Sequence, residues 1–305
     1  MKKYIIKRLL EVIPVLFIIT FVVFVLMYHA GDPVAMMLPE EASQEDRENM
    51  REALGLNDPF IVQYANFLKD ISTGNFGESI RYNTEALPLV LERLPASFEL
   101  AGVAMLVAIL ISVPLGIWSA NKRNTFTDLF ITGGSVLGKA MPNFWLGIML
   151  ILILAVNIQI FPVSGRGTFM HLVLPAITLG TSIAAEMTRL VRSSMLDTLG
   201  QDYIRTASSK GVPYFKVVVY HAFRNTLIPV ITITTLQLSI LVSGSIITES
   251  VFQWPGLGLL LVQAVNARDM AVVQAAVFVI AILVIVVNLI TDLIYVLVDP
   301  RIKYS

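Results

Sequence analysis

The sequence predicts an all-α membrane protein with six transmembrane helices, and three observations support that fold class. The 305 residues are 56% hydrophobic and only 14% charged, about half the charge of an ordinary soluble domain. The apolar residues gather in runs of roughly 20, the length that crosses about 30 Å of hydrocarbon. Lys and Arg are concentrated in alternate linkers between these runs, as the positive-inside rule expects. The chain has no cysteine, which excludes disulfides and thiolate chemistry.

The first apolar run, 9–28, follows a basic N-terminus. We interpret it as a retained helix rather than a signal peptide, because it is long and no small-residue cleavage site follows it. The remaining spans are expected at 96–120, 129–156, 171–194, 229–250 and 271–298. The linkers assigned to the cytoplasm hold 14 Lys and Arg residues against seven in the outer linkers. This difference predicts that both termini are cytoplasmic.

Residues 29–94, between the first and second predicted spans, form the only sizeable extramembrane segment. They are acidic, with twelve Asp and Glu against five Lys and Arg. Ser43 and Asp46 resemble a capping box that opens a helix ending near Gly55. Pro59 is expected to begin a second helix that ends at Gly74. We therefore divide the chain into residues 1–28, an extracytoplasmic helical insertion at 29–94, and a five-helix transmembrane core at 95–305.

A search for catalytic motifs is mostly negative. The chain lacks a phosphate-binding G-x-x-x-x-G-K-[ST] loop, an H-E-x-x-H zinc motif and a G-x-S-x-G nucleophile motif. His29, His171 and His221 lie in segments of different predicted sidedness, so no metal site is expected. If transport is driven by ATP, the nucleotide must bind to another chain.

Charged residues within the predicted spans require an explanation, because each costs about 2.5 to 3.5 kcal/mol at the bilayer centre. Lys139 is expected near the middle of the third span, and Glu186 lies on the fourth with Arg189 and Arg192 at spacings of three. Glu186 and Arg189 can pair along one helical face. Lys139 and Glu186 are candidates for a water-filled pathway. The alternative is structural pairing between helices, with Arg189 and Arg192 reaching the cytoplasmic interface.

The fifth predicted span carries hydroxyl residues at offsets of three, four and four. At 100° per residue these positions share one stripe of the helix. Such a stripe can line a route for a polar solute, or it can allow close helix packing. The sequence leaves both interpretations open for Thr232, Thr235, Ser239 and Ser243.

A polar island at about 196–228 separates the fourth and fifth spans. Residues 204–210 have helical character, Gly211 suits the position after a helix end, and Pro213 suits the first turn of another helix. These residues predict a basic helix–glycine–helix elbow on the cytoplasmic side. Its apolar positions favour docking to a protein groove over an ordinary loop resting on lipid headgroups.

Phrases along the whole chain resemble those of inner-membrane permeases of ABC importers, in particular the dipeptide and oligopeptide subfamily. The elbow is similar to the cytoplasmic EAA loop of these permeases, with Arg205-Thr-Ala207 in the place of Glu-Ala-Ala and Gly211 in the place of the loop's glycine. The matching phrases are LGLNDPFIVQY, TGNFGES, MPNFWLG, FPVSGRG, LPAITLG, RLVRSSMLDTLGQDYIRTASSKG, FRNTLIPVIT and VFQWPGLGLLLVQAVNARD.

The resemblance implies a subunit of the bacterial or archaeal cytoplasmic membrane that pairs with a second, homologous permease. It further implies two cytoplasmic ATPase subunits that carry ATP and Mg, an extracytoplasmic solute-binding protein, and no nucleic acid partner. This chain would hold no cofactor and would not itself be an enzyme. The coupling role falls on Tyr203, Ile204, Arg205, Thr206, Ala207, Ser208, Ser209, Lys210 and Gly211.

The expected function is therefore translocation of di- or oligopeptides through an ATP-driven importer. Nickel or another small solute is the alternative within the same family. An ion-coupled secondary carrier is a different class, but six spans with one dominant cytoplasmic elbow are unlike the two matched halves with broken helices that are typical of many such carriers. An intramembrane hydrolase would require a paired nucleophile and base, which the sequence does not offer.

Overall fold

The computed structural model describes residues 2–30, 34, 38 and 42–298. These residues are helical apart from turns and one isolated β-bridge, and they divide into two compact units. The first unit comprises residues 1–94 and 260–285, and the second comprises 95–259 and 286–305. Three helices continue from one unit into the other: α5 (Ala86–Asn121), α13 (Leu257–Asn266) and α14 (Met270–Val298).

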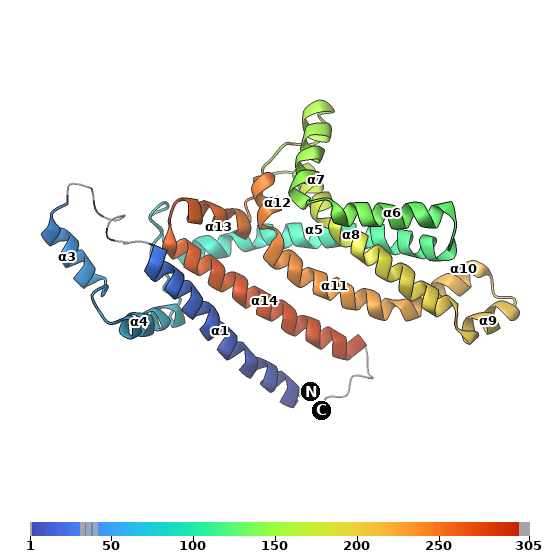
Figure 1. The fold of residues 1–305 in the computed structure, drawn as a ribbon, viewed down its shortest axis with the longest axis horizontal. Coiled ribbons are helices and arrows are strands. Elements are labelled where there is room, and N and C mark those ends of the chain that lie inside the picture. The colour runs from blue at the N-terminus through green and yellow to red at the C-terminus, as the bar shows by residue number, and fades with distance from the viewer. Residues whose placement is uncertain (1, 31–33, 35–37, 39–41, 299–305) are drawn as a thin grey trace. The chain divides into compact units, whose positions relative to one another are not determined.

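The first unit contains α1 (Lys2–Ala30), α3 (Gln44–Ala53) and α4 (Phe60–Ser72) (Figure 1). Ser43 forms the predicted capping box with Asp46, and Gly55 and Gly74 take positive φ angles of 65° and 79° after the two helices. The aromatic face of α4 packs on α1, where Phe24 lies 5.2 Å from Phe60 and 5.3 Å from Tyr64 between ring centroids. Both predicted helices of the insertion are confirmed, while its extracytoplasmic location stays a prediction.

The second unit is organised around α8 (Phe169–Leu199), which is apolar enough to cross a membrane and more than half buried. It packs against α6 (Phe126–Ala140), α7 (Asn143–Leu150) and α11 (Arg224–Gly244). Small residues let α5 approach closely: a Cβ on Gly180 of α8 would come within 2.8 Å of the Ala104 carbonyl oxygen. This close packing is typical of membrane helices.

Four helices in the described residues are long and apolar enough to span a membrane, and a bent pair makes a fifth candidate. The four are α5, α8, residues 214–241 and the part of α14 up to Ile294; α1 contains a shorter apolar stretch, Leu10–Leu26. The all-helical membrane fold is confirmed, and the count of six spans with its sidedness stays a prediction.

The predicted third span, 129–156, is not one straight helix. It consists of α6, α7 and a π-helical continuation η1 (Ile151–Asn157), with a bend of 101° between α6 and the rest. Pro142 causes the break, because proline has no N–H to donate and forces the preceding residue out of helical geometry. Met141 is indeed extended, with φ −73° and ψ 126°. Lys139 consequently lies in the last turn of α6 rather than in the middle of a continuous span.

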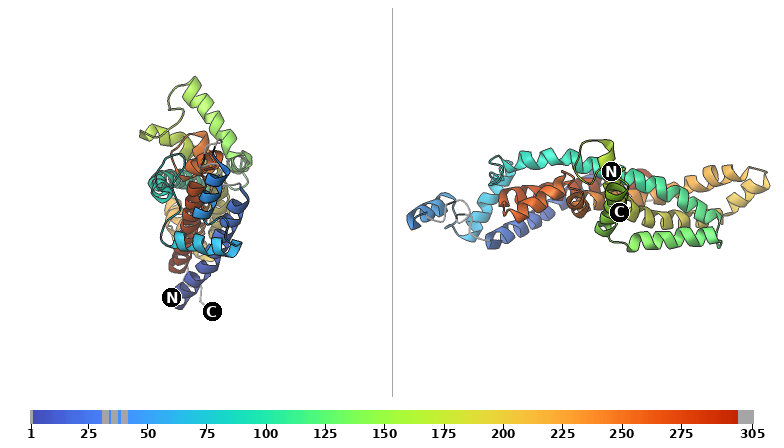
Figure 2. Two further views of the ribbon diagram at one scale, coloured as in Figure 1. Left: turned by 90° about the vertical axis from the view of Figure 1, so that its left-hand side faces the viewer. Right: turned by 90° about the horizontal axis from the view of Figure 1, so that it is seen from above.

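The loops of the second unit gather at two places. The turn from α5 into α6 lies at the same end as α9 (Asp202–Ser209) and α10 (Tyr214–Lys216) in both views (Figures 1 and 2). A hydrogen bond of 3.2 Å from the Tyr214 hydroxyl to Asn121 joins them. Elsewhere the Gly165 N–H donates to the Phe252 carbonyl at 2.9 Å. The linkers at 121–128 and 189–228, both assigned to the cytoplasm, thus contact each other. The linkers that contain Gly165 and Phe252, both assigned to the outside, also contact each other.

Candidate functional site

The short helix α9 follows α8 after a two-residue turn and is amphipathic. Ile204 is only 5% exposed and belongs to the hydrophobic core that also contains Val217 and Ala222. Ala207 is half-buried and packs against the same core. These contacts pack one face of α9 against the helical bundle.

The other face of α9 is open. The remaining seven residues of the predicted coupling set are exposed: Tyr203, Arg205, Thr206, Ser208, Ser209, Lys210 and Gly211. Three aromatic side chains of the following segment, Tyr214, Phe215 and Tyr220, are 62%, 74% and 66% exposed. The structure therefore presents a mixed basic and aromatic surface at the end of α8, which is the composition of a protein-binding surface.

The elbow after α9 has the predicted geometry. Gly211 takes φ 78°, a left-handed conformation that glycine adopts without strain, and its N–H donates to the Ser208 carbonyl at 3.0 Å. Pro213 precedes α10, which continues as the π-helical segment η2 (Val217–Phe223). The Asn225 amide donates to the Tyr203 hydroxyl at 2.7 Å and ties α9 to α11.

A second candidate region is a cavity of about 680 Å³ between α6 and α8, which we call the charged cavity. Lys139 of α6 and Glu186 of α8 form an ion pair there, with 2.8 Å between Nζ and Oε2. The sequence allowed a Glu186–Arg189 pair along one face of α8, but the ion-pair partner of Glu186 is Lys139, across the cavity on α6. The cavity is lined by Thr132, Lys139, Ala185, Glu186, Arg189, Leu190, Arg192 and Ser193.

Arg192, at one edge of the charged cavity, is held by Asp128 of α6 in a bidentate ion pair. Its Nε lies 2.7 Å from Oδ1 and its Nη2 lies 2.7 Å from Oδ2. Asp128 also accepts from the Ser119 hydroxyl at 2.5 Å and from the Asn124 N–H at 3.0 Å. This arrangement, which we call the Asp128 clamp, joins α5, α6 and α8 through one nearly buried carboxylate.

Arg189 has no such partner. Its side chain is exposed, and no carboxylate of the described residues forms an ion pair with it. It lies close enough to Glu186 to influence that carboxylate electrostatically. The charged cavity therefore contains two paired cations and one cation in excess.

At two of the four hydroxyl positions on α11, the hydrogen bonds favour the packing role over the lining role. Thr235 is buried and donates to the Ile231 carbonyl at 2.8 Å, which is a packing role. Ser239 donates to the Asn288 side chain of α14 at 3.0 Å. Thr232 also makes an interaction of its own, and the side chain of Ser243 lies outside the described residues. None of these positions lines the charged cavity.

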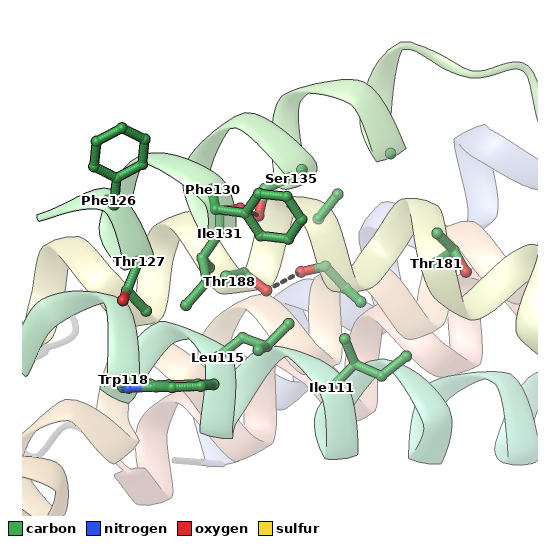
Figure 3. A pocket seen from close by; sticks show the side chains of 14 residues that line it. Ile111, Leu115, Trp118, Phe126, Thr127, Phe130, Ile131, Ser135, Thr181 and Thr188 are labelled. Carbon is green, nitrogen blue, oxygen red and sulfur yellow. Dashed lines mark hydrogen bonds between the residues drawn. The ribbon is translucent and has the colours of Figure 1, made fainter. Parts of the chain in front are cut away.

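An apolar groove of about 650 Å³ lies on a different face of α6 and α8 (Figure 3). Thr181 and Thr188 of α8 lie between two walls formed by α5 and α6. The α5 wall consists of Ile111, Leu115 and Trp118, and the α6 wall includes Phe126, Phe130, Ile131 and Ser135. The Thr188 hydroxyl is satisfied within its own helix, by the Ala184 carbonyl at 2.7 Å. This surface suits lipid chains or another apolar helix, and it contrasts with the charged cavity.

Glu249 forms another buried polar centre that the sequence did not predict. Glu249 of α12 (Ile246–Val251) is fully buried and accepts from the Ser97 and Ser245 hydroxyls, each at 2.8 Å. It also accepts from the backbone N–H groups of Gly258 and Leu259 at 2.7 and 3.1 Å and so caps α13. A signal existed in the sequence, because an acidic residue stands a few positions before a proline–glycine turn and a new helix.

Within the residues that the structure describes, no group of three or more His, Asp or Glu side chains is placed to hold a metal ion. The groups that can act chemically are therefore cations, carboxylates and exposed aromatics that bind and position. Together with the helical core, they define a polytopic membrane protein with a short amphipathic helix, exposed on one face, at one end.

The family of this protein is shown by comparison with known proteins. Residues 112–304 match the binding-protein-dependent transport system inner membrane component, and residues 1–101 match the N-terminal part of such membrane components. The chain belongs to this family of inner-membrane permeases. Membership places it in the inner membrane as a permease rather than an enzyme, with ATPase activity on partner subunits.

Several relatives align over their full length and all of this chain. The oligopeptide transport system permease protein AppB of Bacillus subtilis is 44% identical. The dipeptide transport system permease protein DppB and the glutathione transport system permease protein GsiC of Escherichia coli K12 are each 37% identical. In three dimensions, 69% of the chain matches 96% of a chain of the inward-facing MetNI methionine ABC transporter, with a TM-score of 0.60 and 18% identity. That likeness concerns the fold alone.

Proposed function

We propose that this chain is the translocation subunit of an ATP-driven importer for di- and oligopeptides. The observation that carries the substrate class is full-length identity of 44% and 37% with permeases named for oligopeptide and dipeptide transport. The importer would contain a second, homologous permease, two cytoplasmic ATPase subunits that bind ATP and Mg, and a solute-binding protein outside. Alternating access would follow from closure of the ATPases.

Helix α9 is proposed as the element through which the ATPase acts. Its buried face, anchored by Ile204, makes it mechanically continuous with the bundle, and its exposed face leaves Tyr203, Arg205 and Lys210 free to contact a partner. Arg205 is 77% exposed, and its ion pair with Asp202 at 3.7 Å is open to solvent. Such a contact contributes little to folding, so the residue is available for binding.

Charge reversal on α9 tests the coupling role. We expect Arg205→Glu to reduce both ATPase co-purification and ATP-dependent peptide uptake by about tenfold or more, because charge reversal in an interface costs several kcal/mol. The matched control is Lys69→Glu, the same charge change at an exposed residue of α4, in the insertion assigned to the extracytoplasmic side. Unimpaired assembly and uptake in Arg205→Glu, or an equal loss in the control, would contradict the coupling assignment.

The transport class is tested with the purified complex in proteoliposomes. We expect uptake of di- and oligopeptides that requires ATP on the side of the membrane where the ATPases lie. Uptake should also require the solute-binding protein on the opposite side. Uptake in ATP-depleted vesicles with an imposed ion gradient would identify a secondary carrier instead. Transport of Ni²⁺ without peptide uptake would move the substrate to the small-solute branch of the family.

A further inference from the structure

The charged cavity lies on helices that are expected to cross the bilayer. The side chains of Lys139 and Glu186 are 53% and 43% exposed, and Arg189 is exposed beside them. A charge that faces lipid costs up to about 2.5 to 3.5 kcal/mol, the value at the bilayer centre, so three neighbouring charged side chains disfavour a lipid-facing position. This face of α6 and α8 must meet water or a polar partner.

The ion pairs in the charged cavity leave one positive charge without a carboxylate partner in the described part of the chain. Arg192 is fully engaged by Asp128, and Lys139 is balanced by Glu186 through a single contact of 2.8 Å. Arg189 remains as a cation without a carboxylate partner among the described residues. A cavity of about 680 Å³, within the usual size range of small-molecule sites, thus has one positive charge in excess.

We propose that the charged cavity is a carboxylate-binding subsite in the translocation path, which holds the C-terminal carboxylate of a peptide through Arg189. The inference rests on the proposed function as a peptide importer. A guanidinium presents a planar fork of donors that matches both carboxylate oxygens. Lys139 is a second donor, because its bond to Glu186 is half-exposed and can be exchanged for a bond to the ligand.

Glu186 gives the cavity its second chemical property. A peptide is a zwitterion, and when Lys139 turns toward the carboxylate of the ligand, the Glu186 carboxylate becomes free for an ammonium group. The buried Gln237 side chain of α11 lies near enough to influence the same carboxylate. A site whose internal ion pair competes with the ligand binds only moderately, as a transport site must in order to release its solute.

The test compares peptides that differ only at the C-terminus. The reconstituted complex is supplied with solute-binding protein saturated with a free-acid tripeptide or with its C-terminal amide, and saturation is checked by direct titration. We expect Arg189→Gln to lower uptake of the free acid by about tenfold or more, the usual effect of losing a hydrogen-bonded charge partner. Uptake of the amide should change less than twofold, and ATP hydrolysis stimulated by the binding protein should persist.

Matched variants separate this role from a structural one. Arg189→Lys keeps the charge but not the fork and should retain part of the preference for the free acid. Arg123→Gln, at an exposed arginine outside the cavity, should leave both peptides unaffected. Equal loss for both peptides in Arg189→Gln, or no loss, overturns the proposal.

Two further outcomes are also decisive. If Arg189→Gln does not assemble, Lys139→Gln is measured in the same way, with selective loss of the free acid expected and unselective behaviour contradicting the subsite. If the wild-type complex assembles, hydrolyses ATP and imports neither peptide, the proposed function fails, and the subsite proposal fails with it. A wild type that imports both peptides with no selective variant rejects the subsite alone.

Discussion

The helices α6 and α8 are joined by two ion pairs of different construction. The Asp128–Arg192 pair is bidentate, its carboxylate is 7% exposed, and three further donors, from Ser119, Asn124 and Thr132, complete its coordination. The Lys139–Glu186 pair has one contact, and both side chains are about half exposed. The same two helices thus carry one pair suited to hold them together and one pair suited to open.

The difference follows from what surrounds each carboxylate. Asp128 lies in the first turn of α6, where it meets α5 and α8 and accepts from the nearby Asn124 N–H. Glu186 lies beside a cavity, and its partner Lys139 comes from the last turn of α6, just before the bend at Pro142. A nearly buried pair is costly to break on one side, whereas a half-exposed pair contributes little.

The largest effect is expected from Asp128→Ala. This change leaves the Arg192 guanidinium unpaired in a site where it is only 26% exposed, and it should destabilise the subunit by about 3 to 5 kcal/mol. The thermal midpoint of the purified complex measures the loss. Asp128→Asn keeps the size and one acceptor oxygen, so it should fall between the wild type and Asp128→Ala. An unchanged midpoint in Asp128→Ala would show that the clamp does not hold the helices.

A smaller effect is expected from Ser119→Ala, which removes one donor from the Asp128 clamp. Ser119 is fully buried, and loss of a hydrogen bond to a charged group costs about 1.5 to 3 kcal/mol. Ser112→Ala is the matched control on the same helix, because the Ser112 hydroxyl is buried and has no hydrogen-bond partner among the described residues. The control should be neutral or stabilising, and equal destabilisation of both variants would remove Ser119 from the clamp.

Local sequence signals predicted much of the helical architecture. Capping residues and turn glycines located α3, α4 and α9, because such residues act within a few positions along the chain. The same signals placed Gly211 at the elbow after α9. The assignment of the coupling role to α9 came from a resemblance and stays a proposal.

Contacts between distant residues were outside the reach of these signals. The sequence showed Glu186 and Arg189 at a spacing that allows pairing, yet the partner of Glu186 lies 47 residues earlier. Asp128 and Arg192 are 64 residues apart, and nothing in either segment indicates the other. The bend at Pro142 was foreseeable in kind, since prolines kink helices, but its angle depends on how α6 and α7 each pack on α8.

The smallest effect on stability is expected from removing both charges of the exposed pair, as in Lys139→Met combined with Glu186→Gln. Each replacement keeps the approximate shape of the side chain, and an exposed ion pair contributes only about 0 to 1 kcal/mol, so the thermal midpoint should stay within a few degrees of the wild type. Peptide uptake should fall all the same, because the exchangeable partners of the ligand are gone. A loss of stability as large as that of Asp128→Ala would contradict the distinction between the two pairs. Normal stability with normal uptake would instead show that the Lys139–Glu186 pair is dispensable for transport. Any binding of the peptide carboxylate in the cavity would then depend on Arg189 alone.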